Sequence, residues 1–95
     1  MPQRHTVIHR HQFDVAGTVT LKLQRGAQIL SIAPARTGRE AIDLWTTATE
    51  PAEDLEERHI AVIGTGQPIA ATPLRYIDTV VMPSGLVWHV FEVRP

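Results

Sequence analysis

Glycine and proline divide the chain into short segments rich in β-branched and aromatic residues, and this spacing restricts the possible folds more than any other feature. Residues 18–23 (Thr-Val-Thr-Leu-Lys-Leu) alternate between polar and apolar side chains, which indicates a half-buried strand. Similar strand-forming segments cover residues 6–13, 29–32, 41–47, 59–63, 74–82 and 86–93. The sequence therefore predicts an all-β fold, a small antiparallel sandwich or barrel of about seven strands, in one domain over residues 1–95.

The connections between these segments predict which strands pair. Residues 24–27 contain Gly26 and are short, so we expect the segments on either side, 18–23 and 29–32, to form a hairpin. The Pro83-Ser84-Gly85 turn predicts a second hairpin between the last two strands. Residues 48–57 are a polar connection in which Pro51 and the acids after it could begin at most one short helical turn.

The last predicted strand is apolar on both faces. Residues 86, 88 and 90 (Leu, Trp, Val) should point one way, and residues 87, 89, 91 and 93 (Val, His, Phe, Val) the other. Such a strand is either central and covered twice within the domain, or covered on one side by a second subunit. Because 95 residues provide little material for a second layer, we expect a homo-oligomer, a dimer or tetramer, with this strand at the interface.

Composition excludes several classes of protein. The chain has no cysteine, which excludes disulfides and thiolate metal sites, and no stretch approaches the roughly 20 apolar residues of a membrane helix. With no signal-peptide pattern at its start, the expected location is the cytoplasm. Outside residues 50–57, nine basic residues, eight of them arginine, accompany five acids. Arginine suits phosphate recognition, although an arginine-rich genome would produce the same bias.

The sequence gives little support for catalysis or metal binding. There are two serines, neither in a Gly-x-Ser-x-Gly elbow, and we therefore expect no enzyme activity and no cofactor. His5, His9 and His11 would share one strand face, a spacing at which imidazoles can bind zinc or nickel. The segment lies close to the N-terminus, where a chain is prone to fray, so no metal site is predicted.

Two groups of residues are candidates for binding a ligand. Gly64, Thr65 and Gly66 follow a strand, and successive backbone amides in such a loop can hold an anion, or the glycines can simply ease a turn. The loop lacks the lysine and serine or threonine that end a Walker motif. Aromatic side chains could stack on bases or fill the core, and Arg75 and His89 adjoin two of them: these aromatic candidates are Trp45, Tyr76 and Trp88.

Several stretches together resemble a family of small, uncharacterised proteins encoded by bacteriophages. These are residues 23–30 (Leu-Gln-Arg-Gly-Ala-Gln-Ile-Leu), 63–68 (Ile-Gly-Thr-Gly-Gln-Pro), 74–79 (Leu-Arg-Tyr-Ile-Asp-Thr) and 88–92 (Trp-His-Val-Phe-Glu), with Leu44-Trp45 also fitting. The match departs from the family pattern at Gln24, where proline is usual, and at Asp78, where glycine is expected.

The resemblance implies a function. Related phage proteins include anti-CBASS sponges, homo-oligomers that sequester cyclic nucleotide signals of bacterial antiviral defence without cleaving them. The resemblance therefore implies that this protein acts in the host cytoplasm and binds a cyclic dinucleotide or a related nucleotide. It implies no membrane and no DNA or RNA polymer as a partner. The residues that would bind are Trp45, Tyr76 and Trp88 by stacking, Arg75 and His89 at phosphates or base edges, and Gly64, Thr65 and Gly66 through the backbone.

Two other functions remain open. One is a protein-interaction or structural module, such as an inhibitor of a host protein or a small virion component, in which Trp88 and the last strand would meet a foreign partner. The other is an enzyme acting on nucleotides, with His59 or His89 as the base.

Overall fold

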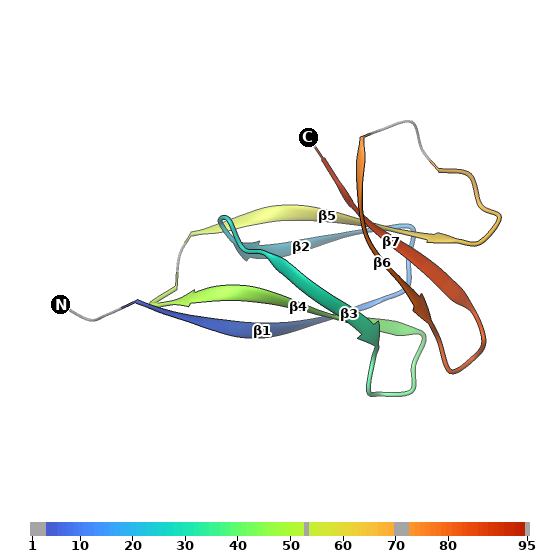
Figure 1. The fold of residues 1–95 in the computed structure, drawn as a ribbon, viewed down its shortest axis with the longest axis horizontal. Coiled ribbons are helices and arrows are strands. Elements are labelled where there is room, and N and C mark those ends of the chain that lie inside the picture. Colours follow the sequence, from blue (N-terminus) through green and yellow to red (C-terminus); the bar gives the residue numbers. More distant parts are fainter. Residues whose placement is uncertain (1–3, 53, 70–72, 95) are drawn as a thin grey trace.

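The computed structural model describes residues 4–52, 54–69 and 73–94. They form an all-β structure of seven antiparallel strands without any helix, and hence without one long and apolar enough to cross a membrane (Figure 1). This confirms the predicted fold class. The strands are β1 (His5–Asp14), β2 (Thr18–Gln24), β3 (Ile29–Pro34), β4 (Ala41–Glu50), β5 (Leu55–Gly64), β6 (Leu74–Val81) and β7 (Val87–Val93).

The strands form two sheets that enclose a thin core. One sheet has three strands in the order β1-β4-β3, and the other has four in the order β2-β5-β7-β6 (Figure 1). Apolar side chains from both sheets meet between them, among them Ile42 and Leu44 of β4, Ile60 of β5 and Val90 of β7, all fully buried. The protein measures 52 × 31 × 16 Å, so the sandwich is flat and elongated.

The predicted hairpin between residues 18–23 and 29–32 is wrong. β2 pairs with β5, whereas β3 pairs with β4, so the two segments belong to different sheets. The connecting residues cross from one sheet to the other: the amide of Arg25 donates to the carbonyl of Asp54, and the amide of Gln28 donates to the Thr47 hydroxyl. Alternation identified both strands, but it contains no information about pairing over long sequence distances.

The connection predicted over residues 48–57 is also largely strand. β4 continues to Glu50 because β1 is equally long and pairs with it through His5 opposite Glu50. β5 then begins at Leu55, and the described residues between these strands form no helical turn. The run of threonines in β4 favours this extended conformation, since β-branched side chains suit a pleated sheet.

The last strand has the two faces that the sequence predicted. Val90 points into the core and Trp88 packs against it, whereas His89 and Phe91 point to the opposite side of the sheet, where they are only half-buried. β7 lies between β5 and β6, so it is not an edge strand. No element of the described chain fully covers its second face, and coverage by another subunit stays a prediction.

Candidate functional site

The four-stranded sheet has one face turned away from the three-stranded sheet, here called the outer face. The strand register brings Ile63 of β5, His89 and Phe91 of β7, and Tyr76 and Thr79 of β6 onto this face. Tyr76 is 55% exposed and its ring contacts Phe91 edge-on, with the ring centroids 5.5 Å apart. Around these residues the outer face is therefore accessible and combines aromatic, apolar and hydrogen-bonding side chains.

Four side chains on the outer face are joined by a continuous line of hydrogen bonds. Thr65 Oγ1 lies 2.9 Å from His89 Nε2, and His89 Nδ1 lies 3.1 Å from Thr79 Oγ1. Thr79 Oγ1 in turn lies 2.6 Å from the Tyr76 hydroxyl. We call this line the polar chain; it connects the loop after β5 with β7 and β6.

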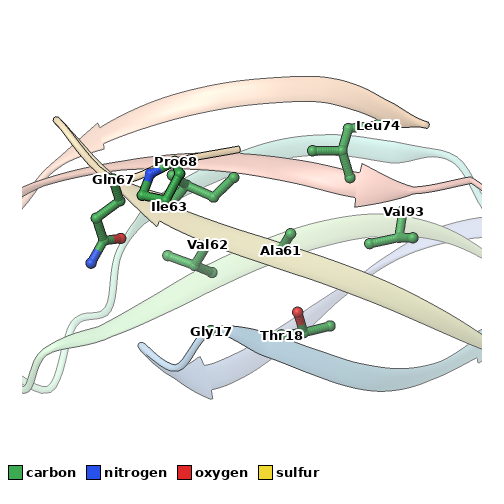
Figure 2. Close-up of a pocket in the computed structure, with 9 residues that line it drawn as sticks. All are labelled: Gly17, Thr18, Ala61, Val62, Ile63, Gln67, Pro68, Leu74 and Val93. Atoms are coloured by element: carbon green, nitrogen blue, oxygen red, sulfur yellow. The ribbon is translucent and has the colours of Figure 1, made fainter. Parts of the chain in front are cut away.

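One hollow adjoins the polar chain, and a second hollow adjoins the first. The first, of about 300 Å³, is lined by residues of the glycine loop together with His89, Phe91, Ile63 and Ile69. The second, of about 350 Å³, lies farther along the sheet, where Thr18, Ala61, Leu74 and Val93 come from four different strands (Figure 2). Ile63 and Gln67 line both hollows, so the two form neighbouring depressions in one surface.

The glycine loop is held in a fixed conformation by Gln67. Its side-chain oxygen accepts a hydrogen bond from the Gly64 amide at 2.6 Å, and its own amide donates to the Gly64 carbonyl at 3.0 Å. A Cβ at Gly64 would lie only 3.1 Å from that side-chain oxygen and 3.2 Å from the Trp88 ring, so glycine permits this close packing. Gly66 adopts a φ of 90°, which favours glycine. The Gly64 amide is thus already engaged, and the loop presents the Thr65 side chain towards His89.

Five of the eight predicted site residues meet here: Gly64, Thr65 and Gly66 in the loop, with Tyr76 and His89 on the sheet. The other three lie off the polar chain, although the Trp88 ring packs against Gly64 and lines a separate hollow with Gly64 and Thr65.

Trp88 points to the opposite side of β7 from His89. Its indole Nε1 donates to Glu40 at 2.9 Å, and Ser84 donates to the other oxygen of the same carboxylate. Trp88 therefore joins β7, and Ser84 joins the β6–β7 turn, to the connection between β3 and β4. Trp88 also packs against the core.

Trp45 and Arg75 are also separated from the polar chain. Trp45 is half-buried on β4, in the other sheet, beside Arg10 and Ser31. Arg75 alternates with Tyr76 and is opposite Glu92, so it faces the other side of β6. It lines a hollow of about 670 Å³ bordered by acidic and basic side chains, including Arg58 and Arg94.

The histidines of β1 form a separate, smaller cluster. His9 and His11 have ring centroids 6.5 Å apart, and His11 Nε2 lies 3.3 Å from the Thr46 hydroxyl. Burial, and secondarily the neighbouring His9, lower the pKa of His11 below its usual value. No group of three or more metal-binding side chains occurs within residues 4–52, 54–69 and 73–94.

Sequence reasoning missed Thr79 and Phe91. A threonine in a strand carries no signal of its own, but the hairpin register determines its position: once the turn at residues 83–85 joins β6 to β7, Thr79 lies opposite His89. A bulge at Ile77 changes the register between Tyr76 and Asp78, and counting residues from the turn would have misplaced Tyr76 by one position.

No curated protein and no solved structure matches the chain. A protein family does match over residues 4–95, nearly the whole sequence, and the chain therefore belongs to the family described as Domain of unknown function (DUF7352).

Proposed function

We propose that this protein binds a cyclic oligonucleotide signal on the outer face of its four-stranded sheet and sequesters it without cleaving it. The observation that supports this most directly is the hydrogen-bonded line from Tyr76 through Thr79 and His89 to Thr65, of which His89 and Thr65 line a hollow of the outer face. The ligand class, and a role for the protein in phage immune evasion in the host cytoplasm, rest on the resemblance to phage sponges.

The outer face offers chemistry that suits a nucleotide. Tyr76 and Phe91 form a pair of aromatic rings, and the exposed part of Tyr76 provides a surface on which a base can stack. Thr65 and His89 offer hydrogen-bonding groups at the border of the adjacent hollow. Both ring nitrogens of His89 lie within hydrogen-bonding distance of threonine hydroxyls, an arrangement that favours a positioned binding group over a free general base.

One protomer offers only part of the site that a cyclic dinucleotide needs. The hollow beside His89, at about 300 Å³, is at the lower limit for small-molecule pockets, and Arg75 lies on the other side of β6. A symmetric dimer would present two copies of the aromatic pair and could bring cationic side chains from a second subunit to the phosphates. Exposed Ile69 and Val81 provide apolar surface for such an interface. The proposal therefore includes a homo-oligomer, a dimer or tetramer.

Thermal unfolding against a panel of cyclic di- and trinucleotides tests the proposal. A ligand at 100 times its Kd stabilises a protein by roughly 2.7 kcal/mol, which for a domain of this size raises Tm by about 10–20 °C. We expect one member of the panel to produce such a shift, and His89→Gln to reduce it. Thr20→Val is the matched control, because Thr20 contacts His59 elsewhere on the sheet and its loss should leave the shift intact. The absence of stabilisation by every nucleotide at saturating concentration would refute the proposal.

The exposed apolar side chains also favour a second candidate, a module that binds another protein. Val81 is 65% exposed and Ile69 58%, so both offer apolar surface that a protein partner could bury. Light scattering and pull-down from host lysate separate the two functions. A monomer that retains one host protein, and loses it on Val81→Asp, would support this candidate over the sponge.

A further inference from the structure

The polar chain has a direction, because each hydroxyl in it has one proton. A neutral histidine carries a proton on one ring nitrogen and accepts at the other. In one order, Tyr76 donates to Thr79, Thr79 to His89 Nδ1, and His89 Nε2–H to Thr65. In the other order every donor and acceptor is exchanged, and Thr65 donates to His89 Nε2.

All three links reverse between the two orders, but only one of them differs in its chemistry. In both, a threonine hydroxyl donates to one imidazole nitrogen and the other nitrogen donates to a threonine oxygen. What changes is the contact of 2.6 Å between Tyr76 and Thr79: either the phenol donates to the alcohol, or the alcohol donates to the phenol. A phenol is the more acidic donor, and its oxygen is the weaker acceptor because its lone pair is shared with the ring. The short distance therefore favours Tyr76 as donor.

This order determines what Thr65 presents to a ligand. With Tyr76 donating, His89 carries its proton on Nε2 and the Thr65 oxygen accepts it, so the Thr65 hydroxyl proton has no partner among residues 4–52, 54–69 and 73–94. Thr65 and His89 both line the hollow of about 300 Å³. We infer that the Thr65 hydroxyl donates into this hollow, and that the group bound there is a hydrogen-bond acceptor, an anionic oxygen such as that of a phosphate. This deepens the proposed function and rests on it for the identity of the ligand.

The tautomer of His89 tests the direction of the chain without any ligand. Two-bond proton–nitrogen correlation spectra of protein with ¹⁵N-labelled histidine distinguish the protonated ring nitrogen from the unprotonated one, and His89→Gln identifies the signals of His89 among the five histidines. We expect the Nε2–H tautomer. An Nδ1–H tautomer, or an equal mixture of the two, would overturn the inference.

Two variants show whether Tyr76 sets this direction. Tyr76→Phe removes the donor at the end of the chain, so the Nδ1–H form of His89 should appear beside the Nε2–H form. Thr20→Val removes a threonine hydroxyl that lies 3.0 Å from His59, and should change the signals of His59 while leaving those of His89 as they were. An unchanged tautomer in Tyr76→Phe would overturn the inference.

A nucleotide identified by the thermal panel provides the second readout. Thr65→Val should weaken its binding about tenfold, the effect of one hydrogen bond to a charged group, whereas Thr65→Ser should restore it. Equal affinity of the Val and Ser variants would contradict the role of Thr65. If no nucleotide binds, the proposed function fails, and the tautomer of His89 still decides the direction of the polar chain. If a nucleotide binds but His89 is the Nδ1–H tautomer, the inference about Thr65 fails while the proposed function stands.

Discussion

The ion pair between Arg58 of β5 and Glu92 of β7 provides a quantitative test of how the four-stranded sheet is held together. The Arg58 guanidinium contacts both carboxylate oxygens of Glu92, through Nε and through Nη2 at 3.0 Å. Its remaining nitrogen, Nη1, donates to the Ala27 carbonyl at 2.7 Å, in the connection between β2 and β3. The hydrogen bond that Arg58 donates to Glu92 is the main reason why the pKa of Arg58 lies above its usual value. Glu92 of the Trp-His-Val-Phe-Glu segment is therefore a structural residue.

The expected cost of breaking this pair follows from its burial. The side chains of Arg58 and Glu92 are only 15% and 12% exposed. Exposed ion pairs contribute up to about 1 kcal/mol, whereas removing one partner of a fully buried pair costs about 3–5 kcal/mol because the other charge is left unpaired. We therefore expect Arg58→Met and Glu92→Leu each to lower the free energy of unfolding by roughly 2–4 kcal/mol. The double variant should cost less than the two single changes together, because it removes both charges of this pair and leaves only Glu56, 3.8 Å from Arg58 Nη1 and one-third exposed, without its cation.

Urea unfolding followed by circular dichroism measures these differences, provided that the slope of free energy against urea stays constant among the variants. The double-variant cycle isolates the coupling between the two side chains. Single variants that lose under about 1 kcal/mol, or a double variant that loses the sum of the two, would refute the reasoning.

Three further predictions concern other contacts of the fold. Folding lowers the pKa of His11, so protonation of this side chain favours the unfolded chain. The contribution of His11 to stability should therefore be present above its unfolded pKa of about 6.5 and be lost as the pH falls below that value. His11→Gln should flatten this part of the curve of unfolding free energy against pH. Trp88→Phe loses the hydrogen bond to Glu40 and should cost roughly 1–2 kcal/mol in urea unfolding, with little change in binding at the outer face. Gln24→Ala removes two hydrogen bonds between the Gln24 side chain and the backbone of Thr49, at 2.7 and 3.2 Å, and should lower Tm by several degrees in a calorimetric scan.

The strands could be predicted from the sequence, but the arrangement of the sheets could not. Alternation and the turn at residues 83–85 gave β6 and β7, their pairing and the two faces of β7, because each is a local property. The pairing of β2 with β5 was missed, because it joins residues such as Thr18 and Ala61 that are distant in the chain. β4 continues to Glu50 because it pairs with β1, and the pattern of residues within β4 does not indicate which strand it pairs with.

The candidate site was predictable in part for the same reason. Tyr76 was selected as a ring on which a base could stack, and His89 because it adjoins Trp88, and the structure places both on the outer face. Trp45 and Trp88 were selected by residue type alone, and residue type does not distinguish a stacking surface from core packing. Arg75 points away from Tyr76 because adjacent residues of a strand alternate between its two faces, and a second subunit could bring a cation to the polar chain in its place.

The central claim, that the protein binds a nucleotide and does not convert it, is tested most directly by recovering what it holds. Purified protein is incubated with a mixture of cyclic di- and trinucleotides, separated from unbound ligand, denatured, and the released molecules are identified by mass spectrometry. The account predicts one intact cyclic nucleotide, in an amount comparable to the number of sites, and its loss from His89→Gln but not from Thr20→Val. Release of a linear product would show an enzyme, and release of no nucleotide would contradict the claim.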